Sequence, residues 1–421
     1  GKIQIFDATD GKVVESIDVG KVGSKTIGAV ASYKYYPVIA AGKVVEIFPV
    51  NGELQYGKTY YVLIEGGALK NGEGAYAGLS DSALWRFSTK KNPPKLPPEA
   101  GRRITVAADG TGDFCTVQGA VDFVPANNNT PTTIDIKRGT YTEMISITGK
   151  NALTFLGEDR KKTVIQYATN ANFNNAPGGG YRRGVFLTQR CSDIVLANLT
   201  VHNTTPQGGS QAEAIIFNGS PTARAIVTGV DLLSYQDTLQ INGQAYVSNT
   251  YIEGDVDFMW GSGPCFFENC ECKAMARQGN SKGYYTQIRN RTNHGYVYYK
   301  CTFDGQDKAT GFLLGRIDPA VYPNSEVVLI DCQMTSAVGD VAWQFDNRTN
   351  PNAATDKIQF LEYNSHDAAG NPVDVSKRLA GSKQLKLPAD EAAVKNYGDA
   401  SWVLGGWTPK IPEEVAKRIG K

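Results

Sequence analysis

A set of equivalent positions recurs through the second half of the chain and strongly limits how it can fold. The positions are Leu199, Val230, Thr250, Cys270, Cys301 and Cys332. Each lies in a short segment of β-forming residues, and the successive spacings are 31, 20, 20, 31 and 31 residues. A repeat of about 20 residues with longer insertions is typical of a parallel β-helix, whose coils stack at about 4.7–4.9 Å. We therefore predict a parallel β-helix for this region.

The first part of the chain has a different pattern. Residues 1–90 alternate apolar and polar positions in short runs separated by Asp-Gly, Asn-Gly and Gly-Gly turns, which predicts a small β-sandwich. The stretches Gly57-Lys58-Thr59-Tyr60-Tyr61-Val62 and Trp85-Arg86-Phe87-Ser88-Thr89 resemble the last strands of bacterial immunoglobulin-like modules. Residues 91–101 are rich in proline, which predicts an extended linker, and residues 102–421 form the β-helix domain. The predicted fold class is all-β.

The sequence contains two candidate helices and a set of cysteines at equivalent repeat positions. Helix-type periodicity is nearly absent outside residues 116–123 and 389–396, and we expect these helices to cap the two open ends of the β-helix. Cys270, Cys301 and Cys332 share one stacking position, so we interpret them as small buried core residues rather than metal ligands. A disulfide between Cys270 and Cys301 remains open for an oxidising compartment.

Charge and histidine content narrow the possible chemistry. The 43 basic and 42 acidic side chains give a net charge of +1, so no bulk charge attracts nucleic acid or anionic lipid. No stretch approaches the roughly 18 apolar residues of a membrane-spanning helix. His202, His294 and His366 are scattered, which disfavours zinc hydrolases and most Ser-His-Asp enzymes. We expect carboxylates to carry any catalysis, with no metal or organic cofactor.

Two aspartates occupy equivalent places on successive coils. Asp237 lies seven residues after Val230, and Asp257 lies seven residues after Thr250. Stacking would bring their backbones to about 5 Å, where one carboxylate raises the proton affinity of the other. Such a pair divides into an acid and a nucleophile or base. Apolar neighbours surround Asp257 in sequence, where an unpaired charge would be costly.

Six motifs lie in order between residues 112 and 316. They are Gly112-Asp113-Phe114-Cys115-Thr116-Val117-Gln118-Gly119-Ala120-Val121, Gly139-Thr140-Tyr141-Thr142-Glu143, Gln211-Ala212-Glu213-Ala214, Gln236-Asp237-Thr238-Leu239, Asp255-Val256-Asp257-Phe258-Met259-Trp260-Gly261 and Leu314-Gly315-Arg316. In this order they resemble the motifs of the pectin methylesterase family. The resemblance implies a right-handed parallel β-helix and a secreted enzyme that hydrolyses methyl esters of polygalacturonate.

The resemblance also implies roles for individual residues. Asp257 would be the nucleophile, and Asp237 would be the general acid and then the base. Gln211 and Gln236 would donate hydrogen bonds to the oxyanion, and the alternative is a structural polar ladder on the β-helix. Arg316 would hold Asp257 ionised. Trp260 would offer an aromatic face to a sugar ring, or simply pack.

The chain departs from the family at the proposed substrate groove. Ile317-Asp318 replaces the Pro-Trp that follows the arginine in the family, so an acidic group stands near where a polyanion would bind. Tyr322 could supply a substitute ring. Glu213 occupies the variable position of Gln-Ala-x-Ala, and the sequence leaves its orientation open.

Several functions remain open from the sequence. The leading hypothesis is a monomeric pectin methylesterase, secreted or located at the cell surface or in the periplasm, from a bacterium. An esterase for another ester is favoured by the missing Trp and by Asp318. A non-catalytic carbohydrate-binding surface protein is favoured by the immunoglobulin-like module, but the intact catalytic set argues against it. A pectate lyase is disfavoured because the chain shows no further acidic cluster suited to calcium.

Overall fold

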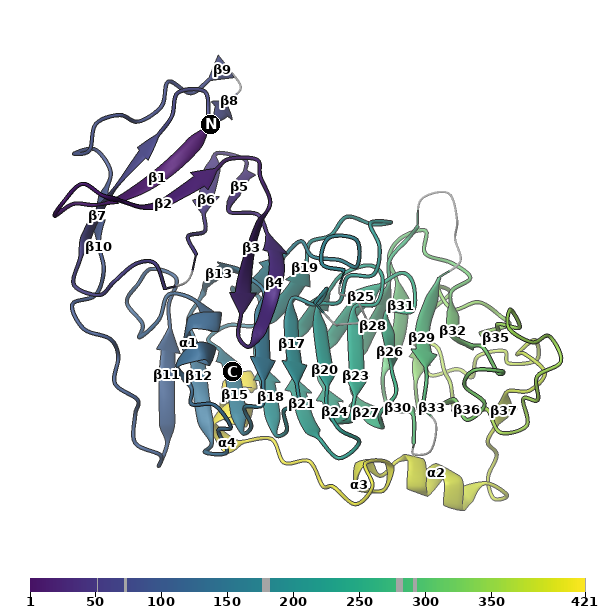
Figure 1. Cartoon of the computed structure of the whole chain (residues 1–421). Coiled ribbons are helices and arrows are strands. Elements are labelled where there is room, and N and C mark those ends of the chain that lie inside the picture. The colour runs from purple at the N-terminus through teal and green to yellow at the C-terminus, as the bar shows by residue number, and fades with distance from the viewer. Residues whose placement is uncertain (51, 72–73, 176–181, 278–282, 291–293, 421) are drawn as a thin grey trace. The chain divides into compact units, whose positions relative to one another are not determined.

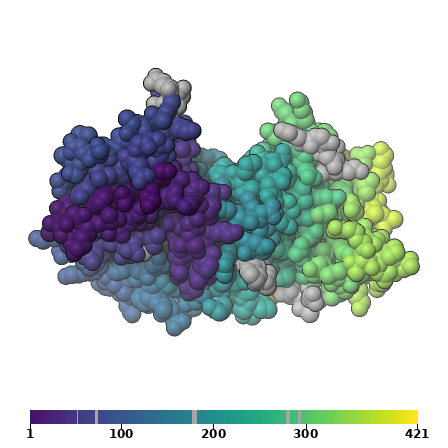
Figure 2. All heavy atoms as spheres, turned by 45° about the horizontal axis from the view of Figure 1, so that its top comes forward, coloured from purple at the N-terminus to yellow at the C-terminus, as the bar shows by residue number. Residues whose placement is uncertain are grey.

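The chain divides into two compact units, residues 1–96 and residues 97–421 (Figures 1 and 2). The structure is a computed structural model that describes all residues except 51, 72–73, 176–181, 278–282, 291–293 and 421. The division falls within the proline-rich segment. Each unit has hydrophobic clusters of its own, so each is described separately.

The regular secondary structure of the first unit consists of β-strands, with no helix among its described residues. One antiparallel sheet has the strand order β10 (Arg86–Ser88), β7 (Thr59–Ile64), β1 (Lys2–Asp7) and β2 (Val13–Asp18). Three hairpins accompany it: β3 (Gly23–Ile27) with β4 (Val30–Tyr35), β5 (Val38–Ala41) with β6 (Val44–Ile47), and β8 (Lys70–Asn71) with β9 (Gly74–Ala75). Alternate residues of β1 and β7 are buried in one cluster, as the period-2 pattern predicts. The immunoglobulin-like identity of this unit stays a prediction.

The second unit is a parallel β-helix built from three sheets, and every third strand pairs with its counterpart on the next coil (Figure 1). Sheet 1 contains β11 (Arg102–Val106), β12 (Thr132–Ile136), β15 (Leu153–Gly157), β18 (Ile194–Ala197), β21 (Arg224–Thr228), β24 (Gln244–Ser248), β27 (Cys265–Glu268), β30 (Tyr296–Tyr299), β33 (Glu326–Ile330), β36 (Gln359–Tyr363) and β37 (Lys383–Gln384). Sheet 2 contains β13 (Gly139–Thr142), β16 (Thr163–Tyr167), β19 (Thr200–Asn203), β22 (Asp231–Leu233), β25 (Tyr251–Gly254), β28 (Glu271–Ala274), β31 (Thr302–Gly305) and β34 (Gln333–Met334). Sheet 3 contains β14 (Ile145–Thr148), β17 (Phe186–Gln189), β20 (Ile215–Asn218), β23 (Leu239–Asn242), β26 (Met259–Gly261), β29 (Tyr284–Ile288), β32 (Leu313–Ile317) and β35 (Trp343–Phe345). The predicted all-β fold with a right-handed parallel β-helix is confirmed.

The repeat found in the sequence is one corner of this β-helix. The residues that directly follow the repeat positions pair in register through sheet 2, from β19 to β34. Every repeat position is buried in the core. The residue before each position has a left-handed backbone, with φ of 55° at Asn198, 62° at Gly229, 49° at Asn249, 51° at Asn269, 54° at Lys300 and 53° at Asp331. Gly, Asn and Asp tolerate this conformation best, which explains why they recur at this corner.

The cysteines are core residues, as predicted. Cys270, Cys301 and Cys332 are stacked and buried, and the backbone N–H of Cys270 points at Sγ of Cys301 at 3.4 Å. All seven cysteines are free thiols in this structure. Burial raises the pKa of the Cys332 thiol to about 12.

One of the two predicted helical caps is confirmed. Helix α1 (Val117–Phe123) contacts β11, β12 and β14, and therefore covers the first coil. The Thr116 side chain caps this helix by accepting a hydrogen bond from the Gly119 N–H at 3.1 Å.

The prediction of a second end cap is wrong. Helix α2 (Glu391–Tyr397) and helix α3 (Ala400–Val403) lie on the outer face of sheet 1, where Tyr397 and Val403 pack with Phe266 of β27 and Val328 of β33. This face carries apolar residues that would otherwise be exposed to water, which is why it recruits the helices. Helix α4 (Glu413–Ile419) continues along the same face, because Val415 packs against β15, β18 and β21 (Figure 1). We call residues 389–420 the C-terminal segment.

We expect residues 97–421 to fold without residues 1–96. The reason is that the described hydrophobic clusters each lie within one unit. Calorimetry of the full chain and of the 97–421 fragment should show the β-helix transition at nearly the same Tm. A fragment that aggregates or loses its cooperative transition would contradict this independence.

Candidate active site

Asp237 and Asp257 lie at the corner between sheets 2 and 3 on successive coils. Gln236 and Val256 form a parallel bridge, and the Asp237 N–H donates to the Val256 carbonyl at 3.1 Å. Both aspartates have a left-handed backbone, with φ of 67° at Asp237 and 48° at Asp257. The spacing in the sequence therefore predicted their equivalent placement correctly.

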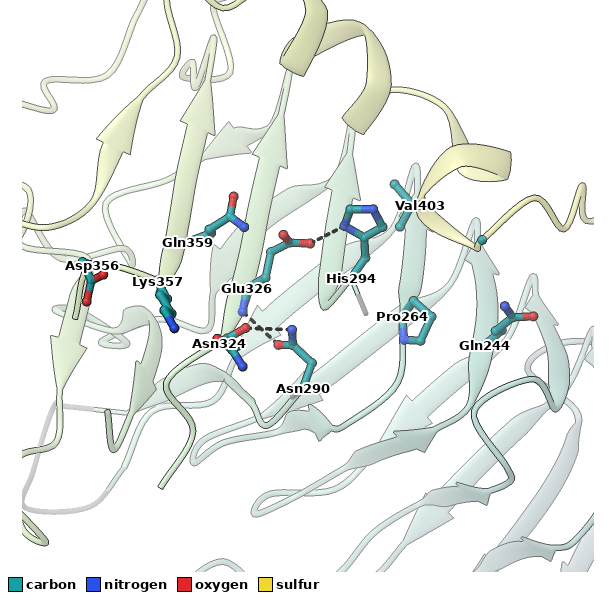
Figure 3. Close-up of a pocket in the computed structure, with 11 residues that line it drawn as sticks. Gln244, Pro264, Asn290, His294, Asn324, Glu326, Asp356, Lys357, Gln359 and Val403 are labelled. Atoms are coloured by element: carbon teal, nitrogen blue, oxygen red, sulfur yellow. Dashed lines mark hydrogen bonds and ion pairs between the residues drawn. The ribbon is translucent and has the colours of Figure 1, made fainter. Parts of the chain in front are cut away.

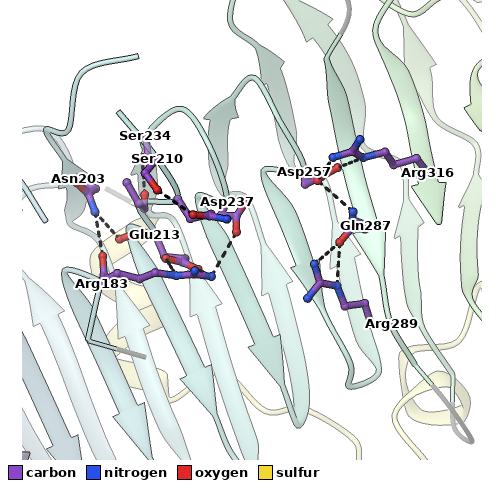
Figure 4. A network of polar contacts seen from close by, with 12 residues as sticks. Arg183, Asn203, Ser210, Glu213, Ser234, Asp237, Asp257, Gln287, Arg289 and Arg316 are labelled. Atoms are coloured by element: carbon purple, nitrogen blue, oxygen red, sulfur yellow. Dashed lines mark hydrogen bonds and ion pairs between the residues drawn. The ribbon is translucent and has the colours of Figure 1, made fainter. Parts of the chain in front are cut away.

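Glu213 occupies the same place on the preceding coil. Its neighbours Ala212 and Ala214 donate backbone hydrogen bonds to the carbonyls of Gln236 at 3.0 Å and Thr238 at 2.8 Å. Glu213 is therefore in register with Asp237. We call Glu213, Asp237 and Asp257 the carboxylate column (Figure 4). The count that linked the aspartates does not find Glu213, because it lies 14 residues after Leu199 rather than seven.

Two arginines bind the outer members of the carboxylate column. From β32, Arg316 donates from Nε to Oδ1 of Asp257 at 2.9 Å and from Nη2 to Oδ2 at 2.6 Å. Arg183 donates from Nε at 2.9 Å and from Nη2 at 2.7 Å to Oε1 of Glu213. The side chain of the central Asp237 is 3.4 Å from Arg183 Nη2, a longer contact than those of the outer carboxylates. Each outer carboxylate thus has a guanidinium fork, and the central one does not.

This arrangement gives the two aspartates different affinities for a proton. Burial raises the pKa of Asp237 well above its ordinary value, and the negative charge of Glu213 raises it further, against the opposing charge of Arg183. Burial also raises the pKa of Asp257, but the hydrogen bonds and charge of Arg316 oppose that rise. The proton is therefore held more strongly by Asp237, and Asp257 is the better candidate for an ionised carboxylate.

Gln211 and Gln236 lie beside the carboxylate column in the chain. Oε1 of Gln211 accepts a hydrogen bond from Ser210 Oγ at 2.9 Å. Among the described residues, neither Nε2 of Gln211 nor the side-chain amide of Gln236 is engaged in a hydrogen bond. Both glutamines therefore retain amide donors for another molecule.

Two further polar residues extend the site beyond those predicted. Nε2 of Gln287 donates to Oδ2 of Asp257 at 3.1 Å, and Nε of Arg289 donates to Oε1 of Gln287 at 2.8 Å (Figure 4). The register pairs Gln287 with Trp260, but the 20-residue repeat would not have found it, because Gln287 lies 27 residues after Trp260.

Arg289 also brings the two predicted aromatic residues together. Its guanidinium carbon lies 4.5 Å from the ring centroid of Trp260 and 5.7 Å from that of Tyr322. Trp260 is only 7% exposed, so little of its indole surface faces solvent in this structure.

Asp318 lies two residues beyond Arg316 and is held by a neighbouring loop. Its Oδ2 accepts from Thr349 Oγ1 at 2.6 Å, and its Oδ1 accepts from the Ala320 N–H at 3.1 Å. The hydrogen bond from Thr349 is the main reason that the pKa of Asp318 is lowered. This side chain therefore remains ionised down to lower pH than an ordinary aspartate.

A separate cavity of about 600 Å³ lies at the start of several sheet 1 strands (Figure 3). Its lining includes His294, Glu326 and Gln359, but no member of the carboxylate column. Oε1 of Glu326 lies 3.0 Å from His294 Nδ1, and Oε2 accepts from Tyr397 at 2.9 Å. Glu326 thus already has two side-chain partners at this cavity, whereas Asp237 in the carboxylate column has no guanidinium fork.

Two searches of the described residues bear on other classes of function. No group of three or more His, Cys, Asp or Glu side chains in this part of the chain is arranged to hold a metal ion. In the same residues, every helix is too short or too polar to cross a membrane.

Comparisons with known proteins agree on one family. The family model described as Pectinesterase matches residues 103–406. Pectinesterase 31 of Arabidopsis thaliana is 30% identical over 276 residues, which cover 62% of this chain and 82% of that protein. The solved pectin methylesterase of Erwinia chrysanthemi is 27% identical, with a TM-score of 0.60, covering 73% of this chain and 98% of that one. A solved pectin methylesterase in complex with a hexasaccharide is 26% identical, with a TM-score of 0.59 and the same coverage of 73% and 98%.

We predict that Asp237→Asn stabilises the fold at neutral pH. Because folding raises the pKa of Asp237, its protonated form contributes stability below the ordinary pKa of 3.8, and this contribution is lost as pH rises through the raised pKa. Each unit of pKa difference corresponds to about 1.4 kcal/mol. Urea unfolding at several pH values should show that the free energy of unfolding of the variant rises relative to that of wild type from pH 4 upward.

Asp318→Asn is a control that should change stability at neutral pH in the opposite direction. Folding lowers the pKa of Asp318, so its ionised form contributes stability above 3.8 that disappears as pH falls through the lowered pKa. This variant should lose stability at neutral pH and match wild type in acid. A constant offset between Asp237→Asn and wild type at every pH would refute the predicted coupling to Asp237.

Proposed function

The chain belongs to the pectinesterase family and is a carboxylic ester hydrolase, and from this premise we propose that it hydrolyses the methyl esters of polygalacturonate and releases methanol. The observation that carries the proposal is the unequal pair of aspartates, with Asp257 in the guanidinium fork of Arg316 and Asp237 without one. A relative solved with a hexasaccharide supports a polymeric sugar as substrate.

In the first half of the proposed reaction, the Asp257 carboxylate attacks the carbonyl carbon of the ester. A bond forms between Asp257 Oδ and that carbon, and the C–O bond to methoxide breaks. Asp237 gives its proton to the departing methoxide, so methanol leaves and an acyl-enzyme anhydride remains. The raised pKa of Asp237 suits this acid role, and the ion pair with Arg316 suits Asp257 to attack as a carboxylate.

The second half reverses these roles. Asp237, now ionised, takes a proton from water as the resulting hydroxide attacks the acyl carbon. The bond to Asp257 breaks, which restores its carboxylate and releases a galacturonate carboxyl group. Asp237 ends protonated again, and the cycle balances without a metal or cofactor.

Gln211 and Gln236 are proposed to stabilise the oxyanion that forms in both halves. Their unused amide donors are neutral, so they can bind a developing negative charge without disturbing the ion pairs of the carboxylate column. Trp260 and Tyr322, joined through Arg289, are proposed to border the sugar-binding groove.

We further propose a secreted or cell-surface monomer that acts on pectin outside the cell. Pectinesterases as a family support the extracellular location. The expected bacterial origin gains no support, because similar proteins include plant pectinesterases such as Pectinesterase 31 and Probable pectinesterase 55 of Arabidopsis thaliana as well as the bacterial enzyme.

A second candidate is the hydrolysis of another ester at the same site. Asp318 favours it, since this ionised group stands where the family has an aromatic residue that would contact a sugar. The carboxylate chemistry would be unchanged, and only the groove would differ.

We expect Asp257→Ala and Asp237→Ala each to lower kcat for methanol release from highly methylated pectin by about 10³-fold or more. The reason is that one variant removes the nucleophile and the other the proton donor. Asp231→Ala is a matched control, because Asp231 is also buried and ion-paired, to Arg160 and Lys161, but lies outside the column. A folded Asp257→Ala protein with near-normal turnover would end the nucleophile assignment.

We expect the enzyme to prefer highly methylated over sparsely methylated pectin. Repulsion between Asp318 and a galacturonate carboxylate, about 1 kcal/mol at 4 Å in water, would bias the choice several-fold. Asp318→Asn should narrow that gap, and salt should narrow it in wild type because exposed charges are screened. Initial rates on pectins of graded methylation would test this. Equal preference in both proteins at low salt would remove Asp318 from the specificity argument.

A further inference from the structure

Glu213 is a buried acidic residue that the proposed reaction does not use. Its side chain is fully buried, and its position in register with Asp237 and Asp257 makes it the third member of the carboxylate column. A buried carboxylate is costly unless it is paired, so its presence beside a catalytic pair calls for a physical account.

Arg183 binds Glu213 more closely than it binds Asp237. Three of its contacts with Glu213 measure 2.7–2.9 Å, whereas the contact between its Nη2 and Asp237 Oδ2 measures 3.4 Å. The fork geometry thus directs most of the guanidinium charge to Glu213.

The number of charges along the carboxylate column shows which carboxyl group is favoured to hold a proton. Within the described part of the chain, the column has three carboxylates and two guanidinium forks, one at each end. The charged groups that face Asp237 are Glu213, Arg183, Asp257 and Arg289. Arg289 donates to Gln287 and lies against Trp260, so it provides no fork for Asp237 either.

We propose that Glu213 is a positioning residue that holds Arg183 away from Asp237 and thereby keeps the proton on Asp237 for transfer to methoxide. This inference rests on the proposed function, because it assigns a cause to the acid role of Asp237. Glu213 touches no reacting atom and acts through Arg183 and through its own negative charge. It therefore sets the upper pH limit of the first half-reaction.

The direction of the effect follows from the two charges. Glu213→Gln removes a negative charge that raises the pKa of Asp237, and it releases Arg183 to bind Asp237 more closely. Both changes favour the ionised form of Asp237. The alkaline limb of the kcat/KM profile, which reports loss of the general acid, should therefore move to lower pH.

The test compares kcat/KM for methanol release from pectin between pH 4 and 10 in wild type and Glu213→Gln. We expect the alkaline limb to move down by about one pH unit or more, with kcat/KM about tenfold lower above it. The acid limb, set by Asp257 in its fork with Arg316, should stay in place. An unshifted alkaline limb in a folded Glu213→Gln protein overturns the proposal.

Glu362→Gln is the matched control. Glu362 is also fully buried and binds Arg378, at 3.0 Å, but it lies in β36 outside the column. This variant should lose stability without moving either limb. If Glu362→Gln moves the alkaline limb as far as Glu213→Gln does, the effect is a general one of losing a buried ion pair and the proposal fails.

Two further measurements keep the proposal open to refutation. Infrared titration of the Asp237 carboxyl band, identified by its absence in Asp237→Asn, should show the same shift in Glu213→Gln without any substrate. If wild type releases no methanol, the proposed function fails while this titration still decides the role of Glu213. Should Glu213→Gln not fold, Glu213→Asp shortens the carboxylate by one methylene and should shift the band in the same direction, and an unshifted band overturns the proposal.

Discussion

The backbone hydrogen-bond ladder between coils is the constraint on which the rest of this structure depends. Parallel strands in register place residue after residue at a separation of about 4.7–4.9 Å, whatever their side chains are. The ladder therefore stacks like residues into columns, such as the buried cysteines of one corner and the carboxylates of another. Side chains that would repel each other in solution are held together by a scaffold that does not depend on them.

The carboxylate column shows how such a scaffold tunes chemistry. Glu213, Asp237 and Asp257 are all buried carboxyl groups, and they differ in what binds them. Arg316 and Arg183 come from the coils beyond the two ends of the column, so only the outer carboxylates meet a guanidinium fork. The difference between a proton donor and a nucleophile thus follows from position in a stack of otherwise similar groups.

The sequence repeat predicted the parallel β-helix and the stacking of equivalent positions. It did not predict contacts between segments that are far apart in the chain. Spacing alone placed Asp237 and Asp257 on successive coils, since the register counts residues. The same count does not reach Glu213 or Gln287, because longer insertions precede both residues. Nothing local in the sequence shows where an arginine from another coil will point. Residues 389–396 were expected to cap an open end, but helix α2 packs on the apolar outer face of sheet 1 instead.

The C-terminal segment changes the mechanical character of the β-helix. A stack of coils that contact only their neighbours behaves as a one-dimensional array, which can fray from either end while its centre stays folded. Here the chain returns from the last coils to the first, where Glu414 binds Arg103 and accepts from Thr133 Oγ1 at 2.7 Å. This return links coils that are far apart in the array. Unfolding of an end coil therefore also breaks contacts between that coil and the C-terminal segment. The C-terminal segment therefore opposes the local unfolding of an end coil while the other coils stay folded.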